Sequence, residues 1–174
     1  LPCPLPSRSE HPRMPHSPQP PLEIAWQSLG TSLAWGDGFE LILVFGSDEG
    51  AKQALWLRAH DELQAQGRAP FERPVVRQAS DLTDQLLRLA VNPVGTQLLP
   101  DTPLWLDLDA YPGDATWDQA RRDFLYRLNE RRAALAREHR CVVVLALPPD
   151  WTKPVAEAAP DLWTIRQPSI YLPS

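Results

Sequence analysis

The chain has 174 residues, a length that suits a single domain with a sizeable hydrophobic core. Its 17 Lys and Arg residues stand against 22 Asp and Glu residues, and the resulting formal net charge of −5 argues against a nucleic-acid-binding protein. No apolar run approaches the ~18 residues of a membrane span, so no membrane contact is expected. The two cysteines, Cys3 and Cys141, match neither a disulfide framework nor a metal site, which predicts a reducing, cytoplasmic location.

Residues 1–21 are rich in proline and nearly free of periodic apolar residues. Such a segment buries too little apolar surface to offset the entropy lost on ordering, so we expect a disordered leader. Residues 22–34 place apolar side chains at roughly helical spacing, which predicts an amphipathic helix at the start of one domain, residues 22–174.

Strand and helix patterns alternate through the rest of the chain. Apolar runs predict five strands, at residues 39–45, 73–77, 103–108, 141–147 and 163–172. Helices are predicted at residues 49–66, 80–89, 117–139 and 153–159. This alternation is typical of βαβ units, so the expected fold class is α/β: a three-layer α/β/α arrangement around a mostly parallel, five-stranded sheet.

The turn after the first predicted strand, residues 46–53, lies where a phosphate-binding P-loop occurs. Gly46 and Lys52 match the pattern G-x-x-x-x-G-K-[ST], but Ala51 replaces the second glycine and Gln53 replaces the hydroxyl residue. A working loop presents backbone N–H groups and a lysine to phosphates and a hydroxyl to magnesium.

Two acidic residues, Asp48 and Glu49, stand where those phosphates would approach. Each would repel a phosphate about 4 Å away by roughly 4 kcal/mol at an effective dielectric constant near 20. The acids instead favour the start of a helix, so we expect a turn that binds nucleotides weakly or not at all.

A second candidate site is the predicted strand that ends in Asp107 and is followed by Asp109. An apolar strand closing on an acid is typical of a Walker B segment, in which the carboxylate orients the water shell of the metal ion. The same two acids could serve a metal-dependent hydrolase, or could simply end a parallel strand. No histidine or cysteine is spaced as a nucleophile–base pair, and His60 and His139 are expected on polar helix surfaces.

Two further segments contain residue types that often occur in protein interfaces. Arg127 and Arg131 lie at positions i and i+4 of the predicted helix 117–139, where they form either a solvated charged face or a docking surface. Near the end of the chain, Asp161, Trp163 and Arg166 combine hot-spot residue types, although Trp163 could instead fill the core.

Together these features resemble the inactive, or degenerate, STAND-type P-loop NTPase domains of bacterial signalling and conflict proteins. The resemblance spans residues 39–172 and rests on five patterns. They are the Walker A-like turn 46–53, the Walker B-like strand 104–107, the sensor-like strand 141–147, the run Leu-Asn-Glu-Arg-Arg at 128–132 and the run Ala-Pro-Asp-Leu-Trp at 159–163.

The resemblance implies a P-loop NTPase-like sheet with strand order 5-1-4-3-2. It also implies a regulatory or scaffolding module in bacterial signalling and anti-phage defence, flanked in a longer chain by effector or repeat domains. Under this interpretation Gly46, Lys52 and Asp107 are remnants of a nucleotide site, no cofactor is required, and Arg127, Arg131, Asp161, Trp163 and Arg166 are contact residues.

The sequence therefore predicts a non-catalytic module for protein–protein interaction. One alternative is a nucleotide-binding switch that hydrolyses slowly or not at all, with ATP or another nucleotide as its ligand. The other is a metal-dependent small-molecule hydrolase that uses Asp107 or Asp109.

Overall fold

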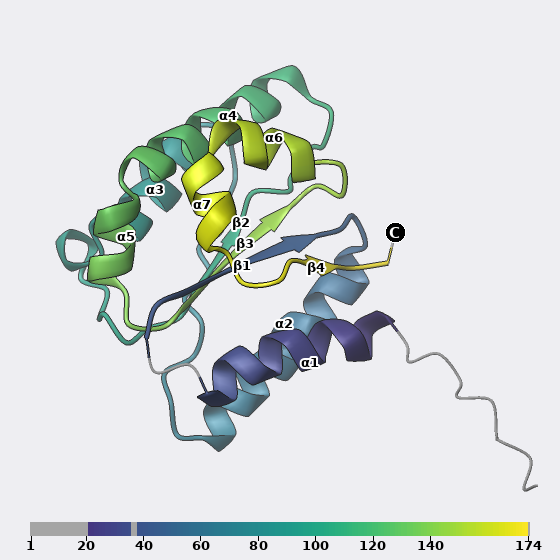
Figure 1. Ribbon diagram of the computed structural model, residues 1–174, viewed down its shortest axis with the longest axis vertical. Helices are drawn as coiled ribbons and strands as arrows, with labels where there is room; N and C mark the ends of the chain where they lie inside the picture. Colours follow the sequence, from purple (N-terminus) through teal and green to yellow (C-terminus); the bar gives the residue numbers. More distant parts are fainter. Residues whose placement is uncertain (1–20, 36–37, 174) are drawn as a thin grey trace, which may run out of the picture.

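The computed structural model describes residues 21–35 and 38–173 of the chain. A four-stranded parallel sheet lies between two helical layers, which is the expected α/β class (Figure 1). All but the last residue of the predicted leader lies outside the described residues. Within the described residues, no helix is both long enough and apolar enough to cross a membrane.

The sheet is built from strands β1 (Glu40–Phe45), β2 (Leu104–Asp107), β3 (Val142–Leu147) and β4 (Ile170–Tyr171), in the spatial order β2-β3-β1-β4. The two central strands pair along their whole length, from Glu40 opposite Val142 to Phe45 opposite Leu147. They consist almost entirely of buried Val, Leu, Ile, Ala and Phe residues, as expected for strands that are covered on both faces. The predicted strands 39–45 and 141–147 are confirmed.

The predicted strand at residues 73–77 is wrong, and so is the expectation of five strands within the described chain. Only Glu72 pairs with the edge of β2: its N–H donates to the carbonyl of Pro103, and its carbonyl accepts from the N–H of Trp105, both at 2.9 Å. The next residue whose backbone would face β2 is Pro74, which has no N–H to donate. The pairing stops there, and the predicted order of five strands is not confirmed.

The last predicted strand, residues 163–172, is mostly wrong as well. Helix α7 (Pro160–Ile165) occupies its first part, and β4 contains only Ile170 and Tyr171. Pro160 stands at the first position of α7, where its fixed φ favours a helix and its missing N–H costs nothing. Pro168 then keeps the chain from pairing regularly with β1 before Ile170.

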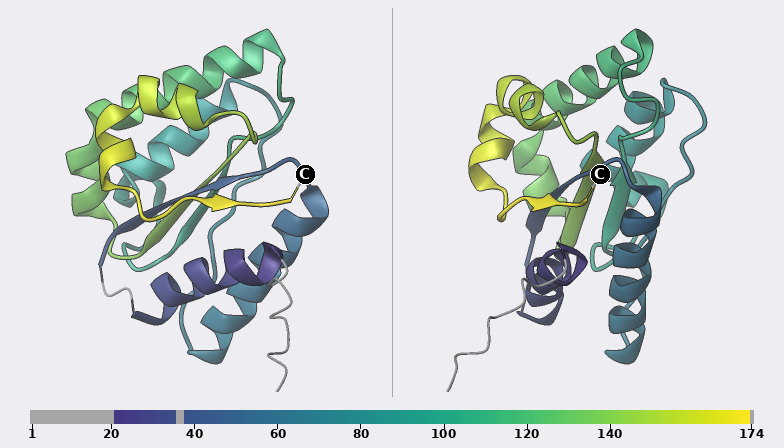
Figure 2. Two further views of the ribbon diagram at one scale, coloured as in Figure 1. Left: turned by 45° about the vertical axis from the view of Figure 1, so that its right-hand side comes forward. Right: turned by 90° about the vertical axis from the view of Figure 1, so that its right-hand side faces the viewer.

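The remaining helices divide between the two faces of the sheet (Figure 1, Figure 2). One face carries α1 (Pro21–Trp35) and α2 (Glu49–Ala65). The other carries the π-helix η1 and helices α3 to α7, while the short 3₁₀-helix η2 (Val94–Thr96) belongs to the connection between α3 and β2. The bounds not yet given are η1 (Leu82–Leu86), α3 (Leu87–Val91), α4 (Ala115–Glu130), α5 (Arg132–Glu138) and α6 (Thr152–Ala158).

One of these helix predictions needs correction in detail, and another is confirmed. The predicted helix 117–139 is divided into α4 and α5 at Arg131, whose backbone leaves the helical region. Its N-cap is Asp114 rather than Thr116, because the Asp114 carboxylate accepts from the N–H groups of Thr116 and Trp117. The α2 prediction is confirmed, including Gly67 just beyond its end at a φ of +66°, where glycine is favoured.

Side chains alternate between two cores along each strand. Leu41, Leu43 and Phe45 of β1 point into the core beneath α3 to α7, whereas Ile42 and Val44 point into the core beneath α1 and α2. The chain enters α2 directly from β1 and leaves the carboxyl end of β2 nearby, so the residues after both strands meet at one edge of the sheet.

Candidate functional site

The connection between β1 and α2 is only three residues long, Gly46 to Asp48. Gly46 is buried beneath the end of the chain, where the N–H of Leu172 donates to the carbonyl of Phe45 at 2.8 Å. A Cβ atom at position 46 would lie 2.7 Å from the Cβ of Leu172, closer than real Cβ contacts come. The glycine is therefore required by the crossing C-terminal segment, which accounts for it without a phosphate.

The start of α2 is closed by the chain's own carboxylate. Asp48 is the N-cap, and its Oδ1 accepts from the N–H of Ala51 at 3.0 Å. Helix N-termini attract anions through these free N–H groups and the helix dipole. Because the helix begins at Glu49, Lys52 lies in the first turn of the helix instead of at the end of a long phosphate-binding loop.

Lys52 points into a group of three carboxylates and is only 5% exposed. Its Nζ lies 2.6 Å from Oδ2 of Asp109, 3.1 Å from Oε1 of Glu49 and 3.3 Å from Oδ1 of Asp107. The ammonium group thus spans the start of α2 and the end of β2. We call Glu49, Lys52, Arg73, Asp107 and Asp109 the Lys52 cluster.

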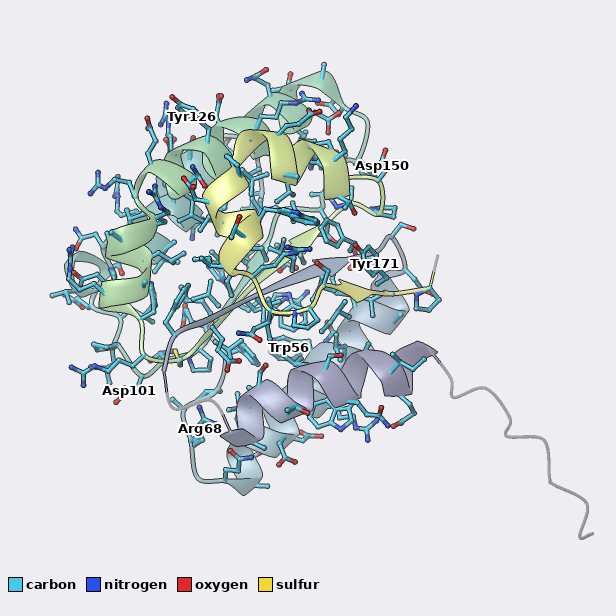
Figure 3. All side chains as sticks on the ribbon, viewed as in Figure 1. Trp56, Arg68, Asp101, Tyr126, Asp150 and Tyr171 are labelled. Carbon is cyan, nitrogen blue, oxygen red and sulfur yellow. The ribbon has the colours of Figure 1, made fainter. Side chains whose placement is uncertain are left out.

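Arg73 completes this cluster from the segment that was predicted to be a strand. Its Nε and Nη2 lie 2.8 Å and 3.2 Å from the two carboxylate oxygens of Asp107, a two-pronged contact that guanidinium groups favour. The same guanidinium lies over the rings of Trp56 and Trp105, 5.3 Å and 5.6 Å from their centroids. Figure 3 shows Trp56 in the region between α2 and the sheet.

Arg73, Trp56 and Trp105 were not predicted as site residues. Arg73 and Asp107 are 34 positions apart, and no motif links them. The bridge between Glu72 and Leu104 brings them together. Only a correct alignment of residue 72 with β2 would have indicated this pair.

In the Lys52 cluster, burial and the neighbouring opposite charges act in opposite directions on the pKa values of Lys52 and Asp109. Burial by itself would lower the pKa of Lys52, but the neighbouring charges of Asp109 and Asp107 outweigh it, so the pKa lies above its usual value. Burial raises the pKa of Asp109, although the contact with Lys52 acts in the opposite direction. At neutral pH the ammonium of Lys52 is therefore firmly charged and held by its carboxylates.

A cavity of about 330 Å³ opens beside the Lys52 cluster, between it and residues 74–76. Both cations on its wall are already paired with carboxylates. An incoming phosphate would have to separate those pairs in a partly buried place, where unpaired charges are costly. The described residues contain no grouping of three or more His, Cys, Asp or Glu side chains suited to a metal ion.

The two C-terminal sequence patterns contact each other. The Oδ1 of Asn129 accepts from the N–H groups of Asp161 and Leu162, at 3.0 Å and 3.1 Å, and so caps the start of α7. The Nη1 of Arg132 lies 3.2 Å from Oδ2 of Asp161. Both patterns thus hold α7 against α4, and Asp161 is part of this internal contact.

Trp163 and Arg166 are also engaged within the chain. The guanidinium of Arg166 stacks on the Trp163 ring, 3.3 Å from its centroid, and also donates to the Trp163 carbonyl. Its Nε donates to the hydroxyl of Ser169 at 3.1 Å. By contrast, Arg127 on α4 and Arg131, directly after its last residue, are exposed. The predicted contact residues therefore do not form one surface.

The expectation that His139 would lie on a polar helix surface is wrong. It is 1% exposed, and its Nε2 lies 2.7 Å from the carbonyl oxygen of Ala90. Burial lowers its pKa, so the ring is neutral at pH 7. Cys141 is buried too, and burial raises the pKa of its thiol to about 12, which makes it an inert core residue.

The Lys52 cluster neutralises its own charges and fixes the carboxyl edge of the sheet. At the Lys52 cluster the lysine is held by carboxylates, and the carboxylate of Asp48 accepts from the N–H of Ala51 at the start of α2. No family model matches the sequence, and no curated protein matches it either.

Proposed function

We propose that this domain is a non-catalytic protein–protein interaction or regulatory module of degenerate P-loop NTPase ancestry, part of a larger bacterial signalling or defence protein. The observation that carries the proposal is the position of Lys52, the residue that should face a phosphate. It is buried against Asp109, Asp107 and Glu49 instead.

The ancestry is supported by the arrangement of the connections. The first strand leads through a glycine into a helix that bears the lysine, and a second strand brings its terminal aspartate to that lysine. The order β2-β3-β1-β4 also keeps the relative positions that the resemblance implies for its third, fourth, first and fifth strands. Pro74 explains why a second strand is missing from this series.

The non-catalytic role is supported by the short loop and its cap. Three residues connect β1 to α2, and the carboxylate of Asp48 already occupies the helix N-terminus. Because Lys52 and the start of α2 are bound by carboxylates of the same chain, the domain's remaining contribution is a rigid scaffold with exposed helices. Those surfaces are what a regulatory or scaffolding module offers to its partners.

Isothermal titration with ATP, ADP and GTP in the presence of magnesium tests this proposal. We expect no saturable heat up to millimolar nucleotide with the unaltered protein. Saturable binding that disappears in Lys52→Ala would contradict it, because such binding would mean that Lys52 leaves its carboxylates to hold a phosphate. A Lys153→Ala variant is the matched control, since Lys153 is an exposed lysine on α6.

A nucleotide-binding switch remains the second candidate, and the cavity beside Lys52 and Arg73 favours it. The same titration separates the two functions. The hydrolase alternative is weaker, because the ammonium of Lys52 stands between Asp109 and Asp107, where a metal ion would have to sit. That alternative predicts a divalent-metal-dependent activity that is abolished in Asp107→Asn.

A further inference from the structure

Arg121 of α4 is a buried cation outside the Lys52 cluster, with 0% of its surface exposed. Among the described residues its carboxylate partner is Asp118, one helical turn earlier, whose Oδ1 lies 2.6 Å from Nη2 of Arg121. A buried guanidinium is stable only where its N–H groups have acceptors, because unpaired polar groups are costly away from water. The other acceptors of Arg121 therefore indicate which part of the chain it holds in place.

Those other acceptors are backbone carbonyls on both sides of Asp109, in the connection between β2 and α4. Nη1 of Arg121 donates to the carbonyls of Leu108 and Ala110, at 3.0 Å and 2.5 Å. Its Nη2 donates to the carbonyl of Tyr111 at 2.9 Å. The N–H of Leu108 still pairs with β3 at 2.8 Å, so the contacts of Arg121 begin where the pairing of the sheet ends.

The bend in this connection is not favoured by its own backbone. Tyr111 has a φ of +48°, in the left-handed region that residues other than glycine rarely adopt. Such a conformation persists only where surrounding contacts hold it. Tyr111 is itself 66% exposed, so burial of its side chain contributes little. The hydrogen bond from Arg121 to its carbonyl is one contact that holds the bend.

The two aspartates of the Lys52 cluster differ in how they are anchored. Arg73 contacts both carboxylate oxygens of Asp107. Among the described residues, the carboxylate of Asp109 makes its hydrogen bond and ion pair with Lys52 alone. The position of Asp109 therefore depends on its backbone, which Arg121 holds. Figure 2 shows α2 and α4 on opposite faces of the sheet, so this connection links Lys52 on one face to Arg121 on the other.

We propose that Arg121 is a positioning residue that keeps Lys52 closed off from ligands, because it holds the backbone around Asp109 in the place where the carboxylate meets the ammonium. Asp109 and Ala110 also form part of the wall of the cavity beside the Lys52 cluster. A shift of residues 108–111 would therefore open Lys52 to this cavity. The inference rests on the proposed function, because it names the contact that keeps the lysine of the degenerate site occupied.

Acetylation with an N-hydroxysuccinimide ester, mapped by mass spectrometry, tests the proposal. The chain contains two lysines, Lys52 and Lys153, and the side chain of Lys153 is 86% exposed, so Lys153 is an internal standard. In the unaltered protein we expect Lys52 to react at least about tenfold more slowly than Lys153, because a reagent reaches a buried ammonium only through local opening. In Arg121→Met the ratio of Lys52 to Lys153 acetylation should rise by about tenfold or more.

Arg122→Met is the matched control. The guanidinium groups of Arg121 and Arg122 both lie 5.3 Å from the ring centroid of Trp151. Arg122 is exposed, however, and within the described part of the chain it donates no hydrogen bond to residues 108–111. This variant should leave the acetylation ratio unchanged. Asn129→Ala, which removes the cap of α7, controls for a loss of stability alone.

Arg121→Lys keeps the proposal testable if Arg121→Met does not fold. It retains the charge beside Asp118, but an ammonium lacks the planar fork that reaches three carbonyls, so we expect the ratio to rise by about threefold. Thermal unfolding establishes that each variant is folded. A ratio that stays at the parental value in every folded Arg121 variant, or that rises as much in Arg122→Met or Asn129→Ala, would overturn the proposal.

The labelling experiment and the nucleotide titration fail independently. An unchanged acetylation ratio would remove the positioning role of Arg121 and leave the titration unaffected. Nucleotide binding by the unaltered protein that depends on Lys52 would instead refute the proposed function, whatever residue positions Asp109.

Discussion

The Lys52 cluster and the contact between α4 and α7 are two places where chemically suggestive residues serve the fold, and they do so differently. In the cluster, the side chains of Lys52 and Asp109 are 6% and 7% exposed, so each charge depends on the other for compensation. At the second contact, Arg132 and Asp161 are about half exposed, and the amide of Asn129 supplies the hydrogen bonds to the backbone of α7. The first region holds charges away from water, whereas the second leaves its charges in water.

The difference shows that the free energy lost when a contact is broken depends on the group that is left without its partner. Removing one member of a buried ion pair leaves the other charge without solvent or partner. Removing one member of an exposed pair leaves a charge that water stabilises. Similar contact distances in the two regions therefore correspond to different free energies.

The largest effect is expected from Lys52→Ala. This variant leaves Asp109 and Asp107 facing each other in a partly buried place, and we expect the free energy of unfolding to fall by about 3–5 kcal/mol. The double variant Lys52→Met, Asp109→Leu removes both charges and should recover most of that loss. Urea unfolding followed by circular dichroism measures all three proteins, and a Lys52→Ala variant as stable as the parent would show that the cluster is well solvated.

A smaller effect is expected from Asn129→Ala. The variant removes the acceptor for the N–H groups of Asp161 and Leu162, and a lost cap of this kind costs about 1 kcal/mol. Asp161→Ala leaves the backbone cap in place and breaks only solvent-exposed contacts, the pair with Arg132 and the hydrogen bond from Nδ2 of Asn129, so it should cost less than about 0.5 kcal/mol. If the two variants lose equal stability in the same urea experiment, the contrast between the amide cap and the exposed charge is wrong.

The last effect appears only as the pH falls and concerns His139, a buried basic group that lacks the carboxylates surrounding Lys52. Its pKa is lowered from 6.5 by burial, so the unfolded chain binds the proton more readily and stability falls as the pH drops below 6.5. Over the first pH unit below that value the loss is at most about 1 kcal/mol.

His139→Gln keeps a side-chain N–H for the carbonyl of Ala90 without a titrating ring. It should show a flatter dependence of unfolding free energy on pH over the same interval. A steeper dependence in the variant than in the parent would place the acid sensitivity elsewhere in the molecule.

Local patterns were sufficient for the central elements. The apolar runs of β1 and β3 and the glycine that ends α2 each act within a few residues, so the sequence predicts them. The predictions failed where proline decided the outcome. Val75 and Val76 favour a strand, but Pro74 cannot donate the next hydrogen bond to β2, and Pro160 starts a helix where a strand was expected.

The candidate site was predicted in part. Gly46, Lys52 and Asp107 were identified from their spacing, and the structure brings Lys52 and Asp107 together while using Gly46 for the passage of Leu172. Arg73 was missed because its contact depends on how residue 72 aligns with β2. The contact of Asn129 with Asp161 was missed because it depends on how two different helices, α4 and α7, pack together.

The sequence alone determined the alternation of strand and helix patterns, and it placed a glycine, a lysine and an acid in an order that resembles a P-loop domain. It could do so because hydrophobic periodicity and residue type are local properties. Which charges meet, and whether a lysine faces solvent or three carboxylates, was decided only by the tertiary structure. The reason is physical: the stability of an ion pair depends on its burial and on distances of a few ångströms between residues that are far apart in the chain.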